Sequence, residues 1–277
     1  MVKICILLST YNGEKYLGEQ LDSLFAQTYE NFEILVRDDG SNDKTMEIIK
    51  SFQDRYPSQI KILKDSFGNI GSAYSFMRLL EGSNSEYFMF CDQDDVWMKN
   101  KIKHSVQKMQ ELEEKYAKDI PLMVFSDLRV VDEKLNTVDM SFWHYQKLSP
   151  EISKNQKKLL AQNVITGCTV MINKEAKYVS LPFAVDTMMH DHWIGVNVAK
   201  YGKIAWLPEQ TVLYRQHSVN VAGAHRFGLV YVAQKMLNLI NIFKKQKRVV
   251  KHFKNVTIFE LIFWKIQINI KRLLERQ

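Results

Sequence analysis

Residues 88–97 read FMFCDQDDVW, and three aspartates stand within four positions directly after a short apolar run. The run from Tyr87 to Cys91 has the length and composition of a buried β-strand. Carboxylates this close together raise one another's pKa, and burying them costs free energy unless a cation or a polar ligand compensates the charge. The stretch therefore predicts a strand that ends at a site for positive charge.

Apolar runs of this kind alternate with stretches of helical period along the first part of the chain. Four strands are expected there, at 2–8, 32–37, 59–64 and 86–91. Three helices are expected with them, at 14–27, 43–56 and 99–118. Shorter strands are expected after Pro121, at 122–126, 128–132, 164–173 and 204–214. The alternation is typical of βα units and predicts an α/β fold, with a Rossmann-like, mostly parallel mixed sheet flanked by helices.

Length and cysteine spacing limit the class of protein. The chain has 277 residues, 46% of them hydrophobic, which is enough for one large α/β core. Its three cysteines lie far apart without the spacing of metal ligands, so we expect neither a disulfide framework nor a structural zinc. The N-terminal apolar run is too short to span a membrane. These features predict a cytoplasmic protein.

Positive charge is concentrated near the C-terminus. Residues 225–277 carry twelve Lys or Arg and two Glu, a net charge of +10, whereas residues 1–224 carry −3. We therefore expect a core at 1–224 and a basic amphipathic helical tail at 225–277. Basic residues at 244–254, set among aromatic ones, fit a helix that lies on an anionic membrane surface. Nucleic acid is the other class of partner for such charge, and a dimerisation or packing helix is the plain alternative.

Polar loops follow three of the predicted strands, at 9–12 (STYN), 38–41 (DDGS) and 92–95 (DQDD). Because ligands bind at the carboxyl ends of strands in open α/β sheets, we expect the three loops to form one site. A DxD pair suits Mg²⁺ or Mn²⁺, which in turn neutralises a diphosphate. Hydroxyl groups and a tyrosine suit a nucleotide base. Taken singly, each motif is also an ordinary Asp-Gly turn or an Asp-rich helix cap.

The stretches LLSTYNGEKYL, VRDDGSNDKT and FCDQDDVW, in this order and at this spacing, resemble the three N-terminal signatures of family 2 glycosyltransferases. The resemblance covers about residues 1–220, and within the family it is greatest to the bacterial rhamnosyltransferase-like branch of surface polysaccharide synthesis. It implies the A-type glycosyltransferase fold. It also implies inverting transfer from a nucleotide-sugar donor, dTDP-rhamnose or a UDP-hexose, to a saccharide or lipid-linked acceptor.

The resemblance implies roles for individual residues. The donor nucleotide would contact Thr10, Tyr11, Asn12, Asp39 and Asp92. Asp94 would bind Mn²⁺ or Mg²⁺, and His217, in the segment YRQH, would be a further ligand. Asp95 would either support the metal ligands or cap the next helix.

A later motif, MMHDHWIG at 188–195, supplies a candidate general base. One carboxylate suffices to deprotonate an acceptor hydroxyl, and Asp191 is the candidate. Gly167, His190 and Trp193 are expected on the acceptor side of the site. Local sequence alone also allows Asp191 to be a helix N-cap, with Trp193 in the core.

Two other classes of function fit parts of the sequence. DQDDV matches the DxDx[TV] pattern of aspartate-nucleophile phosphatases, but that motif would close the first strand and would leave DDGS unexplained. A non-catalytic saccharide-binding protein would leave the acidic residues without a purpose. We therefore expect a metal-dependent inverting glycosyltransferase at the inner face of the cell membrane. The partners expected are donor, acceptor and membrane, with no nucleic acid and with a second copy of the chain as a further candidate.

Overall fold

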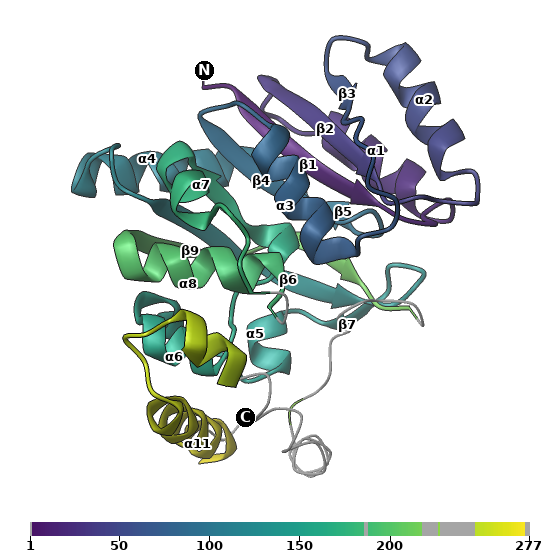
Figure 1. The fold of residues 1–277 in the computed structure, drawn as a ribbon. Coiled ribbons are helices and arrows are strands. Elements are labelled where there is room, and N and C mark those ends of the chain that lie inside the picture. Colours follow the sequence, from purple (N-terminus) through teal and green to yellow (C-terminus); the bar gives the residue numbers. More distant parts are fainter. Residues whose placement is uncertain (1, 186–187, 218–226, 228–246, 275–277) are drawn as a thin grey trace.

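A mixed β-sheet runs through the part of the chain that the computed structural model describes, residues 2–185, 188–217, 227 and 247–274. The strands in this part are β1 (Ile4–Thr10), β2 (Phe32–Asp38), β3 (Ile60–Ile62), β4 (Tyr87–Cys91), β5 (Val96–Trp97), β6 (Leu122–Val131), β7 (Thr137–Asp139), β8 (Met171–Asn173) and β9 (Lys203–Arg215). Nine strands of the described residues thus pair in the order β3-β2-β1-β4-β8-β6-β9-β5, with β7 beside β6 (Figure 1).

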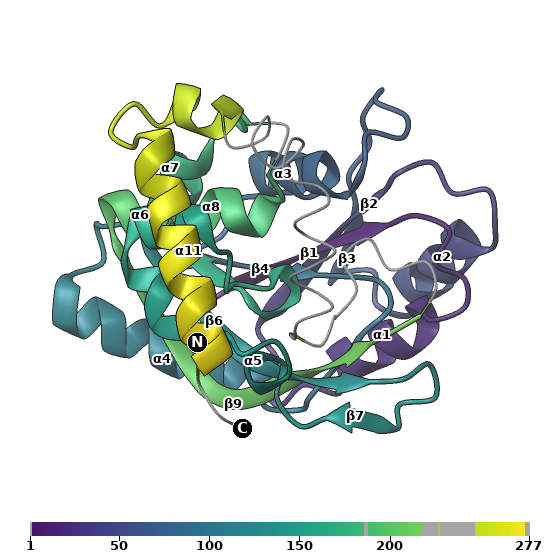
Figure 2. The same ribbon diagram turned by 90° about the horizontal axis from the view of Figure 1, so that it is seen from below.

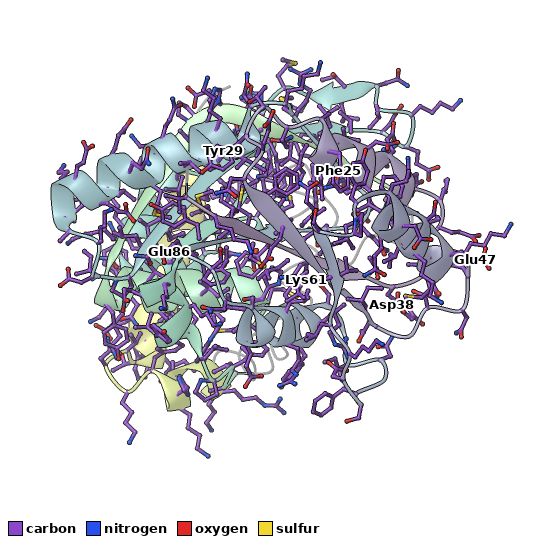
Figure 3. All side chains as sticks on the ribbon, turned by 90° about the horizontal axis from the view of Figure 1, so that it is seen from above. Phe25, Tyr29, Asp38, Glu47, Lys61 and Glu86 are labelled. Atoms are coloured by element: carbon purple, nitrogen blue, oxygen red, sulfur yellow. The ribbon has the colours of Figure 1, made fainter. Side chains whose placement is uncertain are left out.

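The strand directions place the predicted loops at one edge. β1 pairs in parallel with β2 and β4, and β2 pairs in parallel with β3. The sheet turns mixed beyond β4, because β8 is antiparallel to both β4 and β6. Figure 3 shows Asp38 and Glu86 at opposite ends of the parallel strands. Asp38 is the last residue of β2, and Glu86 precedes β4. The loops that follow β1, β2 and β4 therefore meet at one carboxyl edge.

Helices cover both faces of the sheet. They are α1 (Leu17–Phe25), α2 (Thr45–Arg55), α3 (Ser72–Gly82), α4 (Lys101–Tyr116), α5 (Phe142–Tyr145), α6 (Gln156–Ala161), α7 (Lys174–Ser180), α8 (His190–Tyr201) and α11 (Ile258–Leu274), with 3₁₀ turns η1 (Pro150–Lys154) and η2 (Gly167–Thr169). Ile4, Ile6 and Leu8 of β1 pack toward α1, α2 and α4. Cys5 and Leu7 face α3, α6, α7 and α8. This alternation is the period of a strand buried on both faces.

Three sequence-based expectations were wrong. The segments 122–126 and 128–132 form one strand, β6, whose register against β9 shifts near Asp127. Most of 164–173 is not a strand, because Asn163 and Thr169 side chains bind nearby backbone groups and compete with sheet pairing. Helix α3 was not expected. It lies between Gly71 and Gly82 and has no side-chain cap, so the local sequence lacks the usual start signal.

The described part of the tail is helical. A helical segment at 247–252 leads into α11, which crosses the lower side of the molecule beside α6 (Figure 2). Residues 225–226, 228–246 and 275–277 of the predicted tail lie outside the described residues. No helix in the described part of the chain combines the length and the apolar composition that a membrane span requires.

The junction of α8 and β9 offers a test of the fold. A Cβ on Gly202 would lie 1.8 Å from the Pro121 carbonyl oxygen, which also accepts the Lys203 N–H at 2.9 Å. We expect Gly202→Ala to lower the free energy of unfolding by about 1–3 kcal/mol or more, because backbone on both sides must shift. Urea denaturation measures this loss.

Gly18 is the matched control, since a Cβ there meets nothing within 4 Å and the residue lies in α1. Gly18→Ala should leave stability unchanged or raise it by about 0.5–1 kcal/mol. Equal effects of the two substitutions would contradict the described junction.

Candidate active site

The loop after β1 is tied to the loops after β2 and β4. Thr10 is buried, and its Oγ1 donates to Asp38 Oδ1 at 2.9 Å. The Gln93 amide holds the Tyr11 backbone on both sides, accepting its N–H at 2.8 Å and donating to its carbonyl at 2.9 Å. The Asn12 N–H donates to Ser41 Oγ at 2.8 Å. The Tyr11 side chain stays 45% exposed, so its ring is available to a ligand at this edge.

The loop after β2 contains two aspartates with different surroundings. Asp38 accepts the N–H groups of Gly40 and Ser41, and Gly40 has φ +88°, so the expected Asp-Gly turn is present. Asp39 is 3% exposed and receives Arg37 Nη1 at 2.5 Å. It also accepts the N–H groups of residues 70 and 71 at 2.9 and 2.8 Å. Asp39 thus holds the segment before α3 against the sheet edge, and its contact with a nucleotide stays a prediction.

The acidic loop after β4 is partly buried, and Asp95 is its one fully buried residue. Asp95 is completely buried; its Oδ1 accepts the Arg215 N–H at 3.1 Å, and its Oδ2 has no hydrogen-bond partner among the described residues. Burial, followed by the charges of Asp94 and Asp191, raises the pKa of Asp92 to about 8. Burial and the neighbouring carboxylates also raise the pKa of Asp95 well above its ordinary value. The helix-cap alternative is wrong here, because β5 intervenes and Asn100 occupies the N-cap of α4.

Three basic residues, His217, Arg215 and Lys101, border this loop. His217 Nε2 lies 2.8 Å from Asp94 Oδ2. Arg215 is buried, donates from Nε to the Asp94 carbonyl at 2.9 Å, and stacks over the Tyr16 ring at 4.6 Å. Lys101 is buried beside Asp95 and Cys168, and desolvation lowers the pKa of its amine to about 8. The protein therefore compensates part of the negative charge with its own residues.

The donor set suits a hard divalent cation. Its possible ligands fall into two groups. Asp94 Oδ2 and His217 Nε2 form a pair 2.8 Å apart, and Asp95 Oδ2, in the second group, is a buried oxygen without a hydrogen bond among the described residues. Asp92, Asp95 and Cys168 each place one ligand atom within 4.8 Å of the others. The Cys168 thiol does not suit Mg²⁺ or Mn²⁺, because sulfur is a soft ligand and these hard cations prefer oxygen. Burial also raises the pKa of this thiol well above its ordinary value. The oxygen donors fit such an ion.

Asp191 faces the acidic loop from α8. It is the second residue of that helix, and Met189 is the N-cap, so the N-cap alternative for Asp191 is wrong. Its Oδ1 accepts the His192 N–H at 2.6 Å, and Asn163 Nδ2 approaches its Oδ2 at 3.4 Å. Burial raises the pKa of Asp191 to about 6. A carboxyl group with this pKa is ionised at neutral pH and is a stronger base than an ordinary aspartate.

Gly167 lies beside Asp191 and against the His190 ring, since a Cβ on Gly167 would lie 3.7 Å from the Asp191 Cβ. A Cβ on Gly167 would come within 2.6 Å of His190 Nε2, so only glycine fits there. His190 is buried between the rings of Phe76 and Phe90, at centroid distances of 4.2 and 5.2 Å. Burial lowers the pKa of His190 to about 3, so the ring is neutral. The structure therefore brings Gly167 and His190 to the site beside Asp191.

Trp193 points into the core. It is 3% exposed, donates from Nε1 to the Ser180 carbonyl at 2.7 Å, and packs against Phe183 and Phe253. This is the packing role that the local sequence also allowed. Its expected place on the acceptor side stays a prediction without a contact that supports it.

Sequence reasoning missed three residues that shape this edge, Gln93, Lys101 and Arg215. Gln93 lies inside the DQDD motif and Arg215 inside YRQH. Their positions next to motif residues could have marked them as part of the site. Lys101 gave no signal, because a lysine at the start of a charged helix is expected to face water.

The chain was compared with known proteins. The model of the family described as Glycosyl transferase family 2 matches residues 5–177. A dTDP-rhamnosyl transferase of Shigella flexneri, RfbG, is 29% identical over 231 residues, which are 79% of this chain and 74% of that protein. An uncharacterized protein of Mycobacterium tuberculosis is 32% identical over 217 residues, covering 77% of this chain and 58% of the relative.

Two solved structures share the fold. TarS of S. aureus, in complex with UDP-GlcNAc, superimposes with a TM-score of 0.59 at 19% identity, over 79% of this chain and 60% of that one. A mannosyltransferase of Pyrobaculum calidifontis, in complex with GDP-Man and Mn²⁺, gives a TM-score of 0.59 at 16% identity, over 88% and 64% of the two chains. This chain thus spans less than two thirds of either structure. The fold is the A-type glycosyltransferase fold, and the chain belongs to glycosyl transferase family 2.

Proposed function

We propose that the chain is a metal-dependent inverting glycosyltransferase of cell-surface polysaccharide synthesis. It would move a sugar from a nucleoside-diphosphate donor to a saccharide or lipid-linked acceptor. The observation that carries the proposal is the position of Asp191 near the acidic loop, where its charge helps to raise the pKa of Asp92. The raised pKa of Asp191 itself suits a general base. Family membership supports sugar transfer as the reaction class.

The donor is the finer part of the proposal. The similar proteins differ in their named donors, since one is a dTDP-rhamnosyl transferase and the solved structures hold UDP-GlcNAc or GDP-Man. We favour dTDP-rhamnose because the Shigella relative is similar over 79% of this chain, with UDP-hexoses as the alternative. Thr10, Tyr11, Asn12, Asp39 and Asp92 are proposed to line the nucleotide.

Two groups of residues are proposed to have separate roles, one at the leaving diphosphate and the other at the acceptor hydroxyl. Mn²⁺ or Mg²⁺, held by Asp94 and His217, would offset the charge that builds on the leaving diphosphate. Asp191 would take the proton from the acceptor hydroxyl. At the same time the acceptor oxygen would bond to the anomeric carbon of the donor sugar, and the bond from that carbon to the diphosphate would break. Attack from the face opposite the leaving group inverts the configuration. Gly167 leaves space beside this carboxylate, because any side chain there would strike His190.

The other function classes find less support. The DxD motif follows β4 and not the first strand, which disfavours the phosphatase alternative. A non-catalytic saccharide-binding protein would not need a half-buried carboxylate of raised pKa such as Asp191 near an acidic loop.

We also propose where the enzyme acts. Lys247, Arg248, Lys251 and Lys254 are exposed on the segment before α11, which suits attachment to the anionic inner face of the cell membrane. The enzyme would thus be cytoplasmic and peripheral. No nucleic-acid partner is proposed, and a second copy of the chain is the competing partner for the tail.

The base assignment predicts the effect of replacing Asp191. Asp191→Asn should lower transfer about 10²–10⁴-fold, because the amide cannot accept the acceptor proton. Asp94→Asn should also abolish transfer through loss of the metal ligand. Asp22→Asn, at an exposed position of α1, is the matched control and should transfer normally. Circular dichroism checks the fold, and full transfer by a folded Asp191→Asn protein would remove Asp191 from the base role.

The raised pKa of Asp191 predicts a pH profile. Below a pKa of about 6 the carboxyl group is protonated and cannot act as a base, so kcat/KM should fall tenfold per pH unit on the acid side. Above this pKa Asp191 is ionised, so its own titration should cause no further change in kcat/KM. A profile without an acid limb would contradict the assignment, as would an unchanged limb in the residual activity of Asp191→Asn.

Replacing Gln93 is expected to weaken binding of the donor without changing binding of the acceptor. Gln93→Ala removes both hydrogen bonds that fix the Tyr11 backbone, so KM for the donor should rise about tenfold while KM for the acceptor stays the same. Gln107→Ala, at an exposed position of α4, is the control. Steady-state kinetics with each substrate varied in turn gives both constants, and equal changes in the two would refute a donor-side role.

A further inference from the structure

Helix α11 presents an apolar face to solvent. The exposed side chains are Phe259 at 81%, Phe263 at 52%, Ile266 at 54%, Ile270 at 51%, Leu273 at 43% and Leu274 at 75%. They recur at intervals of three or four residues, so they share one side of the helix, here called the α11 outer face. Single exposed apolar residues are ordinary, but a contiguous row of this size marks an interaction surface.

The opposite side of α11 fixes the orientation of the helix. Leu261 and Ile268 are buried in the core that lies over α6 and α8. Lys157 pairs with Glu260 at 2.5 Å, and Lys265 donates to Gln162 Oε1 at 2.8 Å. Arg272 is buried and donates to the Gln146 carbonyl at 2.6 Å. These contacts at both ends and the middle of the helix hold the α11 outer face away from the body of the protein. Figure 2 shows the course of α11 across the lower side of the molecule.

Charge on the segment that carries the α11 outer face is mainly positive, and the neighbouring Glu151 pairs with Lys154. Lys247, Arg248, Lys251 and Lys254, here called the basic cluster, are exposed on the segment that leads into α11. Glu260 is the one acidic residue of the sequence from 247 to 274, and Lys157 neutralises it. An apolar surface bordered by positive charge is complementary to an anionic lipid bilayer, whose headgroups are negative and whose interior is hydrocarbon.

The three- and four-residue spacing of the apolar side chains on the α11 outer face would also fit a two-helix coiled coil. The charges near this face disfavour such a dimer of two copies of the chain. The flanking positions from 260 to 274 carry Ile262, Gln267, Asn269, Leu274 and Glu260. Glu260 is the one charged residue among these and already pairs with Lys157, so these positions offer no set of opposite charges to fix a pairing. Two tails of net positive charge would also repel each other. The helix has 17 residues, about 25 Å in length, which is shorter than the hydrocarbon core. It therefore suits a position parallel to the membrane plane.

We propose that the α11 outer face inserts into the acyl boundary of an anionic bilayer while the basic cluster contacts lipid headgroups. This inference rests on the membrane attachment proposed above and specifies its main contact, an apolar face and not charge alone. Lipid binding should consequently keep a component that salt does not screen, because apolar insertion does not depend on ionic strength.

Vesicle sedimentation with the full chain tests the proposal. The probes are phosphatidylcholine vesicles with and without phosphatidylglycerol, at low and at high salt. We expect Phe263→Glu/Ile270→Glu to lower partitioning onto phosphatidylglycerol vesicles by at least about tenfold at both salt concentrations. Lys251→Gln/Lys254→Gln should lower it at low salt only. Tyr201→Glu, a control at an exposed aromatic residue of α8, should bind like the unmodified chain.

The other outcomes separate the competing explanations. If only the lysine variant loses binding, charge alone attaches the protein, which overturns apolar insertion and leaves membrane attachment standing. If the unmodified chain binds no vesicle, both proposals fail. If light scattering shows that the glutamate variant dissociates a dimer while vesicle binding is unchanged, the α11 outer face binds a second copy. Transfer to a water-soluble acceptor should be equal in all variants, so a failed vesicle test is distinct from a failed transferase assignment.

Discussion

The crowding of four carboxyl groups, Asp92, Asp94, Asp95 and Asp191, at one partly buried edge is the constraint on which the rest of the site depends. The parallel order of β1, β2 and β4 brings three polar loops to one edge, and α8 adds the fourth carboxylate from the other side. Withdrawal from water raises the pKa of three of these groups. Such an arrangement is costly without positive charge, and the protein supplies part of that charge through its own side chains.

The compensating residues come from distant parts of the chain. Arg215 is the last residue of β9, His217 follows that strand, and Lys101 begins α4. These residues meet the acidic loop only when β9 and α4 pack beside it. The site therefore has two sides. Hydrogen-bonded loops after β1 and β2 form one side, and Asp191 with Gly167 forms the other. A diphosphate with a cation and an acceptor hydroxyl would meet between them.

The sequence predicted the βα pattern of the first hundred residues well, because strands buried on both faces read as unbroken apolar runs. It also predicted which loops share an edge. It failed where side chains of Asn163 and Thr169 replace sheet pairing, and where α3 begins without a cap signal. Within the site it found the carboxylates but missed Arg215, Lys101 and Gln93, because their roles arise from contacts across long sequence separations, such as the 121 residues between Arg215 and Asp94.

Thermal unfolding with nucleoside diphosphates tests the central claim most directly, because a ligand that binds the native state alone raises Tm. The protein would be heated with dTDP, UDP or GDP, each with and without Mn²⁺, alongside Asp94→Asn. The account predicts that one nucleotide class raises Tm only when Mn²⁺ is present and that Asp94→Asn removes the effect. A shift of equal size without the metal, or no shift with any nucleotide, would contradict a site built to bind a metal and a diphosphate together.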